Sequence, residues 1–346
     1  MEYCHRLSWS PSDAPPVELP EGVQREFLTS PGGVLELLTS HVFSEGGEVE
    51  EKPPLLFIHG GFESAFDFTN YLQFFSSHGY SCYAVSLRGH GASYKLGYLS
   101  MFWTCKSLEL SHGGSQYSFA LDVVLAIAHI RSKHSKDVII MGHSSGGGLS
   151  QYILDRNMEK LGGLVTLAAV PGFGSMGVYV NWVKLDPWFP IRIYFKHFGH
   201  PRSPLSSTSL VHNALFSRAF PVESVREVER TMPEYESMRW TVGMMTRFVS
   251  AERVVRNILP TLKGGRRVLV VGGGEDKLMS RGIMERLAAW YRIAWESIRG
   301  EGEEGVEEDS AEVVRFGVVE GSGHHVMKDT MWNVGAEMVL EWLEGR

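Results

Sequence analysis

The sequence predicts an α/β protein in which a mostly parallel, twisted sheet is covered by helices on both faces and is interrupted by an inserted helical cap. Two observations support this prediction. Short apolar runs alternate with longer helical patterns along most of the 346 residues, an order typical of parallel strands joined by helical crossovers. One long stretch, residues 171–256, breaks that alternation. The composition, 43% hydrophobic and 21% charged, is globular and excludes a disordered, collagen-like or coiled-coil chain.

The predicted strands are short apolar runs, most of them ended by glycine or a turn, which is typical of strands buried on both faces. A pair of strands is expected first, over residues 25–40 around the turn Pro31-Gly32-Gly33. The later strands are expected at 54–60, 80–87, 137–141, 163–170, 266–271 and 313–319, and the main helices at 116–132, from about 145, at 279–298 and at 328–344.

These elements divide the chain into four parts. Residues 1–24 are expected to form an N-terminal leader, 25–170 and 257–346 the two parts of the core, and 171–256 the helical cap between them. The cap prediction depends on the content of that stretch, which is rich in aromatic residues and proline and has no short strand-like runs.

Charge and cysteine content limit the partners and the compartment. The formal net charge is −7, but six acids lie in residues 301–309 without a base, so the rest of the chain is nearly neutral. A nearly neutral body gives no basic field for nucleic acid or anionic lipid, so we expect no nucleic-acid partner and interpret 301–309 as a solvated loop. Cys4, Cys82 and Cys105 are too few for a disulfide framework. Without a signal-peptide pattern or an apolar run long enough for a membrane span, we expect a cytoplasmic protein and leave its oligomeric state open.

The strongest chemical motif is Gly142-His143-Ser144-Ser145-Gly146, between a predicted strand and a predicted helix. A serine hydroxyl needs exposure, a neighbouring base and donors for the oxyanion that it creates. A tight strand-to-helix turn exposes the serine, and the two glycines let the backbone pass closely. The alternative is a glycine- and serine-rich turn that only caps the helix.

Three more glycine-rich blocks each follow a predicted strand. The block His59-Gly60-Gly61-Phe62 can supply backbone donors. The block Gly272-Gly273-Gly274-Glu275-Asp276 lacks the residues of a phosphate loop and instead offers a carboxylate that could orient a histidine. The block Gly321-Ser322-Gly323-His324-His325 places a histidine on a loop at the edge of the sheet.

In this order the motifs resemble those of the α/β-hydrolases, in the serine-hydrolase, esterase- and lipase-like branch with a helical cap after strand six. The resemblance spans roughly residues 25–344 and includes Ser86-Leu87-Arg88-Gly89-His90-Gly91-Ala92-Ser93, where Ser86 stands in place of the family's usual aspartate. It implies that Ser144 is the nucleophile, Asp276 rather than Glu275 the acid, and His324 rather than His325 the base. It also implies an oxyanion hole made by the backbone N–H groups of Gly61 and Ser145, with Phe62 as the fallback.

We expect these residues to cleave a carboxylic ester or lactone without a cofactor. His324 would take the Ser144 proton and later donate it to the leaving group, while Asp276 fixes its tautomer. The alternatives are acyl transfer with the same residues and a ligand receptor that keeps a hydrolase pocket. A serine nucleophile argues against epoxide hydrolases and haloalkane dehalogenases of this fold, which normally use aspartate.

The aromatic residues of the cap predict an apolar pocket for a medium-sized small-molecule substrate, although any one of them could instead pack cap against core. The proposed pocket residues are Trp182, Trp188, Phe189, Tyr194 and Phe195. No metal site is expected, because the sequence has no HExxH motif and because His197 and His200 are only two histidines, three positions apart. His90 and His143 are expected to pack behind the site.

Overall fold

The computed structural model describes residues 7–12, 15–41, 51–102, 114–299 and 310–346. The expectations for Cys4, Cys105 and the acidic stretch 301–309 lie outside the described residues. Cys82 is buried and reduced within a strand, where burial raises the pKa of its thiol well above the ordinary value.

Eight strands form one sheet in the order β1-β2-β4-β3-β5-β6-β7-β8, and the predicted fold class is confirmed. β1 and β2 form an antiparallel hairpin, β2 pairs antiparallel with β4, and the remaining neighbours are parallel. The central strands are buried throughout, which explains their continuous apolar runs. The strands are β1 (Gln24–Ser30), β2 (Gly33–Ser40), β3 (Leu55–Ile58), β4 (Cys82–Val85), β5 (Ile139–His143), β6 (Gly163–Leu167), β7 (Val268–Gly273) and β8 (Val314–Val319).

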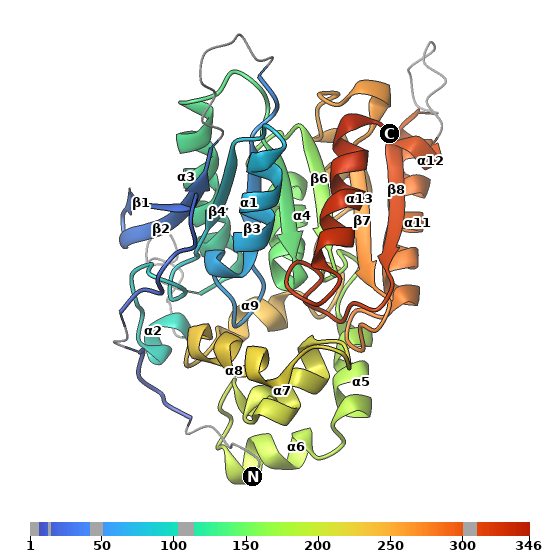
Figure 1. Ribbon diagram of the computed structural model, residues 1–346. Coiled ribbons are helices and arrows are strands. Elements are labelled where there is room, and N and C mark those ends of the chain that lie inside the picture. Colours follow the sequence, from blue (N-terminus) through green and yellow to red (C-terminus); the bar gives the residue numbers. More distant parts are fainter. Residues whose placement is uncertain (1–6, 13–14, 42–50, 103–113, 300–309) are drawn as a thin grey trace.

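Helices cover both faces of the sheet (Figure 1). α1 (Thr69–Ser77), preceded by the 3₁₀ turn Ala65–Phe68, packs beside α13 (Trp332–Glu344) on one face. The other face is covered by α3 (Gln116–Arg131), α4 (Ser144–Asp155) and α11 (Arg281–Arg299). The short helices α2 (Tyr98–Phe102) and α12 (Ser310–Val313) lie at the periphery. In the part of the chain that the structure describes, no helix is both long and apolar enough to cross a membrane.

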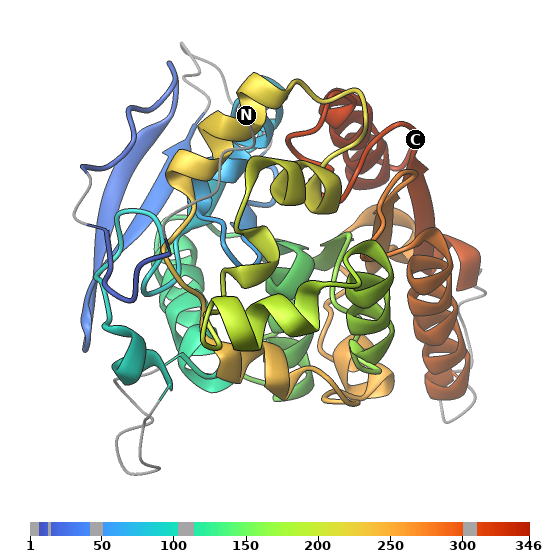
Figure 2. The same ribbon diagram turned by 90° about the horizontal axis from the view of Figure 1, so that it is seen from below.

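Between β6 and β7 the chain forms a run of helices, most of which lie across the carboxyl ends of the strands (Figures 1 and 2). We call residues 171–250 the insertion. α10, which the sequence prediction placed in the cap, instead packs against α4 and α11 on a face of the sheet. The sequence predicted a helical stretch over 171–256 but not the surface that its last helix covers. The helices are α5 (Met176–Leu185), α6 (Phe189–Ile191), the π-helical turn η3 (Arg192–Lys196), η4 (Ser203–Leu205), α7 (Thr208–Leu215), α8 (Val222–Thr231), α9 (Met238–Gly243) and α10 (Ala251–Arg256), followed by η5 (Lys263–Gly265).

Candidate active site

Strand pairing brings four loops together at one edge of the sheet. β3 and β5 are parallel neighbours with Ile58 opposite Gly142, so the chain that leaves β3 runs beside the chain that leaves β5. β7 and β8 are likewise neighbours, with Gly273 opposite Val319. The carboxyl ends of parallel strands meet at one edge, where ligands bind in open α/β sheets.

Ser144 lies at the sharp turn between β5 and α4. Its φ of +49° is in the left-handed region, which non-glycine residues adopt at a cost and which is typical of a strained nucleophile turn. Gly146 permits the turn, because a Cβ there would lie 2.3 Å from the carbonyl oxygen of His59. A Cβ on Gly142 would lie 2.5 Å from the Cα of Gly147. Close backbone packing at this turn therefore holds Ser144 at the carboxyl edge of the sheet.

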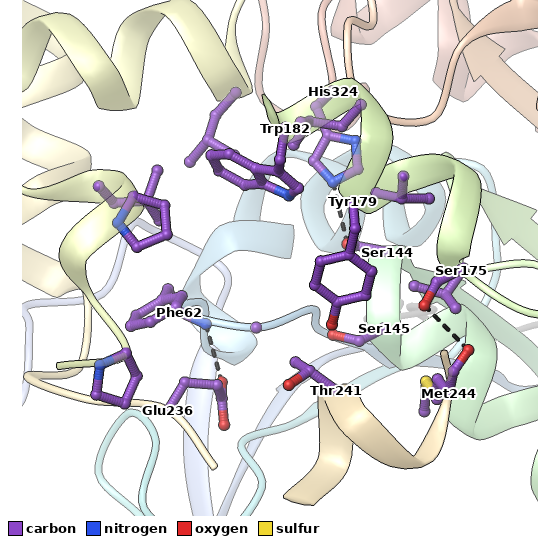
Figure 3. A pocket seen from close by; sticks show the side chains of 18 of the residues that line it. Phe62, Ser144, Ser145, Ser175, Tyr179, Trp182, Glu236, Thr241, Met244 and His324 are labelled. Carbon is purple, nitrogen blue, oxygen red and sulfur yellow. Dashed lines mark hydrogen bonds between the residues drawn. The ribbon is translucent and has the colours of Figure 1, made fainter. Parts of the chain in front are cut away.

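Ser144, His324 and Asp276 form a continuous hydrogen-bonded chain. Ser144 Oγ lies 3.0 Å from His324 Nε2, and His324 Nδ1 lies 2.8 Å from Asp276 Oδ2. Figure 3 shows the serine and the histidine pointing toward each other in the pocket. With Nδ1–H donated to the carboxylate, Nε2 is free to accept the serine proton.

Asp276 is buried and ionised. Its other oxygen, Oδ1, accepts the backbone N–H groups of Leu278 and Met279 at 2.8 and 2.9 Å. Burial alone would raise the pKa of this carboxyl, but His324 and the two N–H groups hold the pKa below its ordinary value. The carboxylate is therefore fixed at both oxygens and negative where an imidazolium would form.

The two neighbours that competed with these residues in the sequence face elsewhere. The Glu275 carboxylate accepts the backbone N–H of Arg218 at 3.1 Å, whereas it is Asp276 that contacts His324. His325 turns into the protein, with Nε2 2.9 Å from Glu63 Oε1.

The loop after β3 holds the candidate oxyanion donors. Gly61 and Ser145 both line the pocket beside Ser144. The N–H of Phe62, the fallback donor, is already engaged, because it donates to Glu236 Oε2 at 3.1 Å. Phe62 also has a φ of +62°, so this part of the loop is held in an unusual conformation. Gly61 is accordingly the better partner for Ser145.

A buried carboxylate that the sequence prediction missed connects three of these loops. Glu63 accepts the backbone N–H of Gly60 at 2.7 Å and the Nδ1–H of His143 at 2.8 Å, and it faces His325. Burial would raise the pKa of Glu63, but the two histidines bring it well below its ordinary value. For His143 the directions are reversed: burial alone would lower the pKa of the imidazole, but the negative charge of Glu63 raises it above the ordinary value. A single acid therefore contacts the loop after β3, the residue before Ser144 and the residue after His324.

Glu236, also missed, comes from the insertion and borders the pocket beside Phe62 (Figure 3). Its Oε2 lies 3.0 Å from His90 Nε2. Burial would raise the pKa of this carboxyl, but its contact with His90 and the hydrogen bonds from the N–H groups of Ser237 and Phe62 lower it. The contact between Glu236 and His90 thus connects the insertion to the core.

Ser86 stands where the resemblance expects an aspartate, and a carboxylate from β2 takes that place. Ser86 Oγ donates to Glu36 Oε2 at 2.7 Å and accepts the N–H of Ala65 at 3.0 Å. Glu36 Oε2 also accepts the N–H of Ala92 at 2.9 Å. The loop after β4 therefore keeps an acidic acceptor, although the acid is 50 residues away in the sequence.

The pocket above Ser144 has a volume of about 170 Å³ and mainly apolar walls. Of the predicted pocket residues, Trp182 and Phe189 line it. The prediction is wrong for Trp188, Tyr194 and Phe195, which are 70%, 70% and 81% exposed and lie on the outer side of the insertion. Successive residues along a helix point in different directions, so Phe189 can line the pocket while its neighbour Trp188 is exposed. Tyr179, Ile193, Leu205, Met238 and Met244 complete much of the wall.

Two histidine groups could be considered for a metal ion. Atoms of Glu63, His143 and His325 lie within 4.8 Å of one another. Their closest contacts, 2.8 to 2.9 Å, are hydrogen-bond distances, shorter than the roughly 3.3 Å between two ligands of a tetrahedral zinc ion. His200 uses both ring nitrogens, toward Ser8 O and the N–H of Arg202, and His197 Nδ1 faces Ser203 Oγ.

Comparison with known proteins places this site in a family. A family model described as the alpha/beta hydrolase fold matches residues 53–327. A non-heme haloperoxidase from Rhodococcus erythropolis is 30% identical over 134 residues, which cover 37% of this chain and 43% of that protein. A non-heme chloroperoxidase from Streptomyces lividans is 31% identical over 119 residues, 34% of this chain and 37% of that protein. The chain thus spans less than half the length of these relatives.

A solved structure extends the likeness to nearly the whole chain. The carboxylesterase CesB from Bacillus subtilis has a TM-score of 0.58 at 14% identity, over 94% of this chain and 93% of that one. At this identity the likeness shows a shared fold.

Proposed function

Because the chain belongs to the alpha/beta hydrolase family, we propose that it is a serine hydrolase that cleaves a carboxylic ester or lactone through an acyl-serine intermediate. The observation that supports this most directly is the hydrogen-bonded chain from Ser144 through His324 to Asp276. Neither a helix cap nor a simple binding pocket requires a serine hydroxyl, an imidazole and a buried carboxylate in that order.

The proposed reaction uses each group where it lies. Ser144 Oγ attacks the acyl carbonyl as His324 Nε2 accepts its proton, and the same nitrogen then donates that proton to the leaving oxygen. The N–H groups of Gly61 and Ser145 stabilise the oxyanion, and the latter lies in the first turn of α4, where N–H groups point out of the helix. Water, activated by His324, then releases the acid from the serine.

The pocket favours an apolar acyl group of moderate size. Its volume of about 170 Å³ is close to that of the roughly 150 Å³ apolar cavity known to accommodate benzene. Trp182, Phe189 and Ile193 would contact the acyl chain. We propose that residues 171–250 act as the cap that provides these contacts.

Acyl transfer and ligand reception remain as alternatives that share this pocket. Acyl transfer uses the same acyl-serine and differs only in the nucleophile that removes the acyl group. A receptor would bind esters without multiple turnovers.

The proposal is tested by hydrolysis of p-nitrophenyl acetate and p-nitrophenyl hexanoate by the wild type, Ser144→Ala and Ser145→Ala. Ser144→Ala should reduce kcat by roughly 10⁴-fold or more, since removal of a serine nucleophile leaves little of the catalysis. Ser145→Ala is the matched control, because it keeps the backbone N–H, and should retain most activity. Residual activity of Ser144→Ala within about tenfold of the wild type would contradict the proposal, as would binding of the esters by the wild type without turnover.

A further inference from the structure

The outer side of the insertion exposes an unusual group of large apolar side chains. We call it the aromatic face, and it is formed by Trp188, Ile191, Tyr194, Phe195 and Phe198, whose side chains are between 52% and 82% exposed. These residues lie in and around α6 and η3, in the part of the insertion that lies beyond the carboxyl ends of the strands (Figures 1 and 2). Clustered exposed aromatic groups of this kind mark an interaction site more often than single exposed apolar residues do.

The segment is two-sided, so the exposure has a regular cause. Phe189 and Ile193, four residues apart, line the pocket. Ile191, Tyr194 and Phe195 lie in the same segment, Phe198 lies in the turn that follows it, and all four side chains are exposed. Phe189 and Ile193 therefore face the pocket, while the other apolar side chains of the segment remain exposed on the surface.

The segment that carries the aromatic face exposes positive charge. Lys196 is exposed next to Phe195 in the sequence, and Lys184 is exposed four residues before Trp188. Asp186, the only acid in residues 171–201, is buried and forms an ion pair with Arg192. The exposed charged side chains of residues 171–201 are consequently the two lysines, although the chain carries a formal net charge of −7.

We infer that the aromatic face binds the surface of a lipid bilayer that contains anionic phospholipids. Trp and Tyr side chains favour the boundary between headgroups and acyl chains, because one end of each ring system is apolar and the other can hydrogen-bond. Phe195 and Phe198 supply purely apolar contact, and the two lysines match anionic headgroups. This inference concerns binding and does not need the proposed hydrolysis. Only its consequence, delivery of lipid-derived acyl groups past Phe189 to Ser144, rests on the proposed function.

The test is sedimentation of the full chain with vesicles, either of equal parts phosphatidylcholine and phosphatidylglycerol or of phosphatidylcholine alone. The wild type should sediment more with the anionic vesicles. Trp188→Ser/Phe195→Ser should lower the apparent partition coefficient by at least about tenfold, and Lys184→Gln/Lys196→Gln by roughly tenfold on anionic vesicles. The matched control is Phe27→Ser/Ile293→Ser, which removes two apolar side chains that are 51% and 65% exposed on β1 and α11, and it should bind like the wild type.

Three outcomes would overturn the inference. The wild type could remain in the supernatant, or the aromatic-face variant could sediment as well as the control. Gel filtration could also give a wild-type dimer that the aromatic-face variant converts to a monomer, with no vesicle binding by either, and the face would then join two copies of the chain. Ser144→Ala should bind vesicles like the wild type, so a failure of the proposed hydrolysis is distinguishable from a failure of this inference.

Discussion

Asp276 shows how a single carboxylate can determine the protonation of the neighbouring histidine. The N–H groups of Leu278 and Met279 require an acceptor at Oδ1, so in Asp276→Asn the amide oxygen must stay there and the NH₂ group must face His324 Nδ1. His324 would then carry its proton on Nε2 and could not accept one from Ser144. We expect kcat to fall by about 10⁴-fold, the size of the effect in serine proteases. Glu275→Gln is the matched control and should be nearly silent in the same ester assay.

Glu63 is predicted to be important for stability as well as for positioning. Glu63→Gln leaves His143 and His325 buried without their anionic partner, and breaking a buried pair in this way costs roughly 3–5 kcal/mol. Urea unfolding followed by tryptophan fluorescence measures the loss. Glu26→Gln, which removes an acid paired with Lys133 near the surface, is the control and should cost less than about 1 kcal/mol.

The loss in Glu63→Gln should depend on pH in a defined direction. Because the pKa of His143 is raised in the folded protein, its contribution is complete below its unfolded pKa of about 6.5 and is lost as pH rises through the folded pKa. Because the pKa of Glu63 is lowered, its contribution is complete above about 4.5 and is lost only in stronger acid. The stability difference between wild type and variant should therefore be larger at pH 5.5 than at pH 8.5. An equal stability difference at both pH values would show that the charge interaction between Glu63 and His143 does not cause the loss.

At the scale of elements, the insertion separates residues that contact substrate from residues that face outward. Trp182 lines the pocket, whereas Trp188 lies on the aromatic face. Trp182→Ser should raise KM for p-nitrophenyl hexanoate about tenfold more than for the acetate, since apolar pockets discriminate by about 1–3 kcal/mol per small group. Trp188→Ser should leave both values unchanged for water-dissolved esters. Thermal unfolding should accompany the kinetics, because equal losses for both esters in a destabilised protein would indicate packing alone.

Elements with one strong local signal could be predicted from the sequence. The strands were recognisable because their burial on both faces requires continuous apolar runs. The turn at Ser144 was recognisable because only glycine fits at positions 142 and 146. The sequence could not show that Trp188, Tyr194 and Phe195 lie on the outer side of the insertion, since a run of aromatic residues does not reveal which of them face the pocket. α10 was misassigned for the same reason, because its apolar side could pack on either surface.

At the scale of the whole molecule, the site is assembled from loops that strand order makes neighbours. That Ser144, Asp276 and His324 lie together could be predicted because each follows a strand whose carboxyl end reaches the same edge, and the family resemblance favoured Asp276 over Glu275 and His324 over His325. Glu63 and Glu236 could not, because their partners include residues far along the chain: His143 is 80 positions from Glu63, and Phe62 is 174 positions from Glu236. No local pattern marks such an acid, and only the folded chain shows which histidine or N–H group it meets.

The central claim, that Ser144 is an activated nucleophile, is tested most directly by labelling with a fluorophosphonate and locating the adduct by mass spectrometry. The wild type should carry one adduct, on Ser144, and Ser144→Ala should carry none. His324→Ala should slow labelling by orders of magnitude, because no base remains to accept the serine proton, while His325→Ala should slow it far less. An adduct on Ser145, an unlabelled wild type, or labelling that is as fast in His324→Ala as in the wild type would contradict the account.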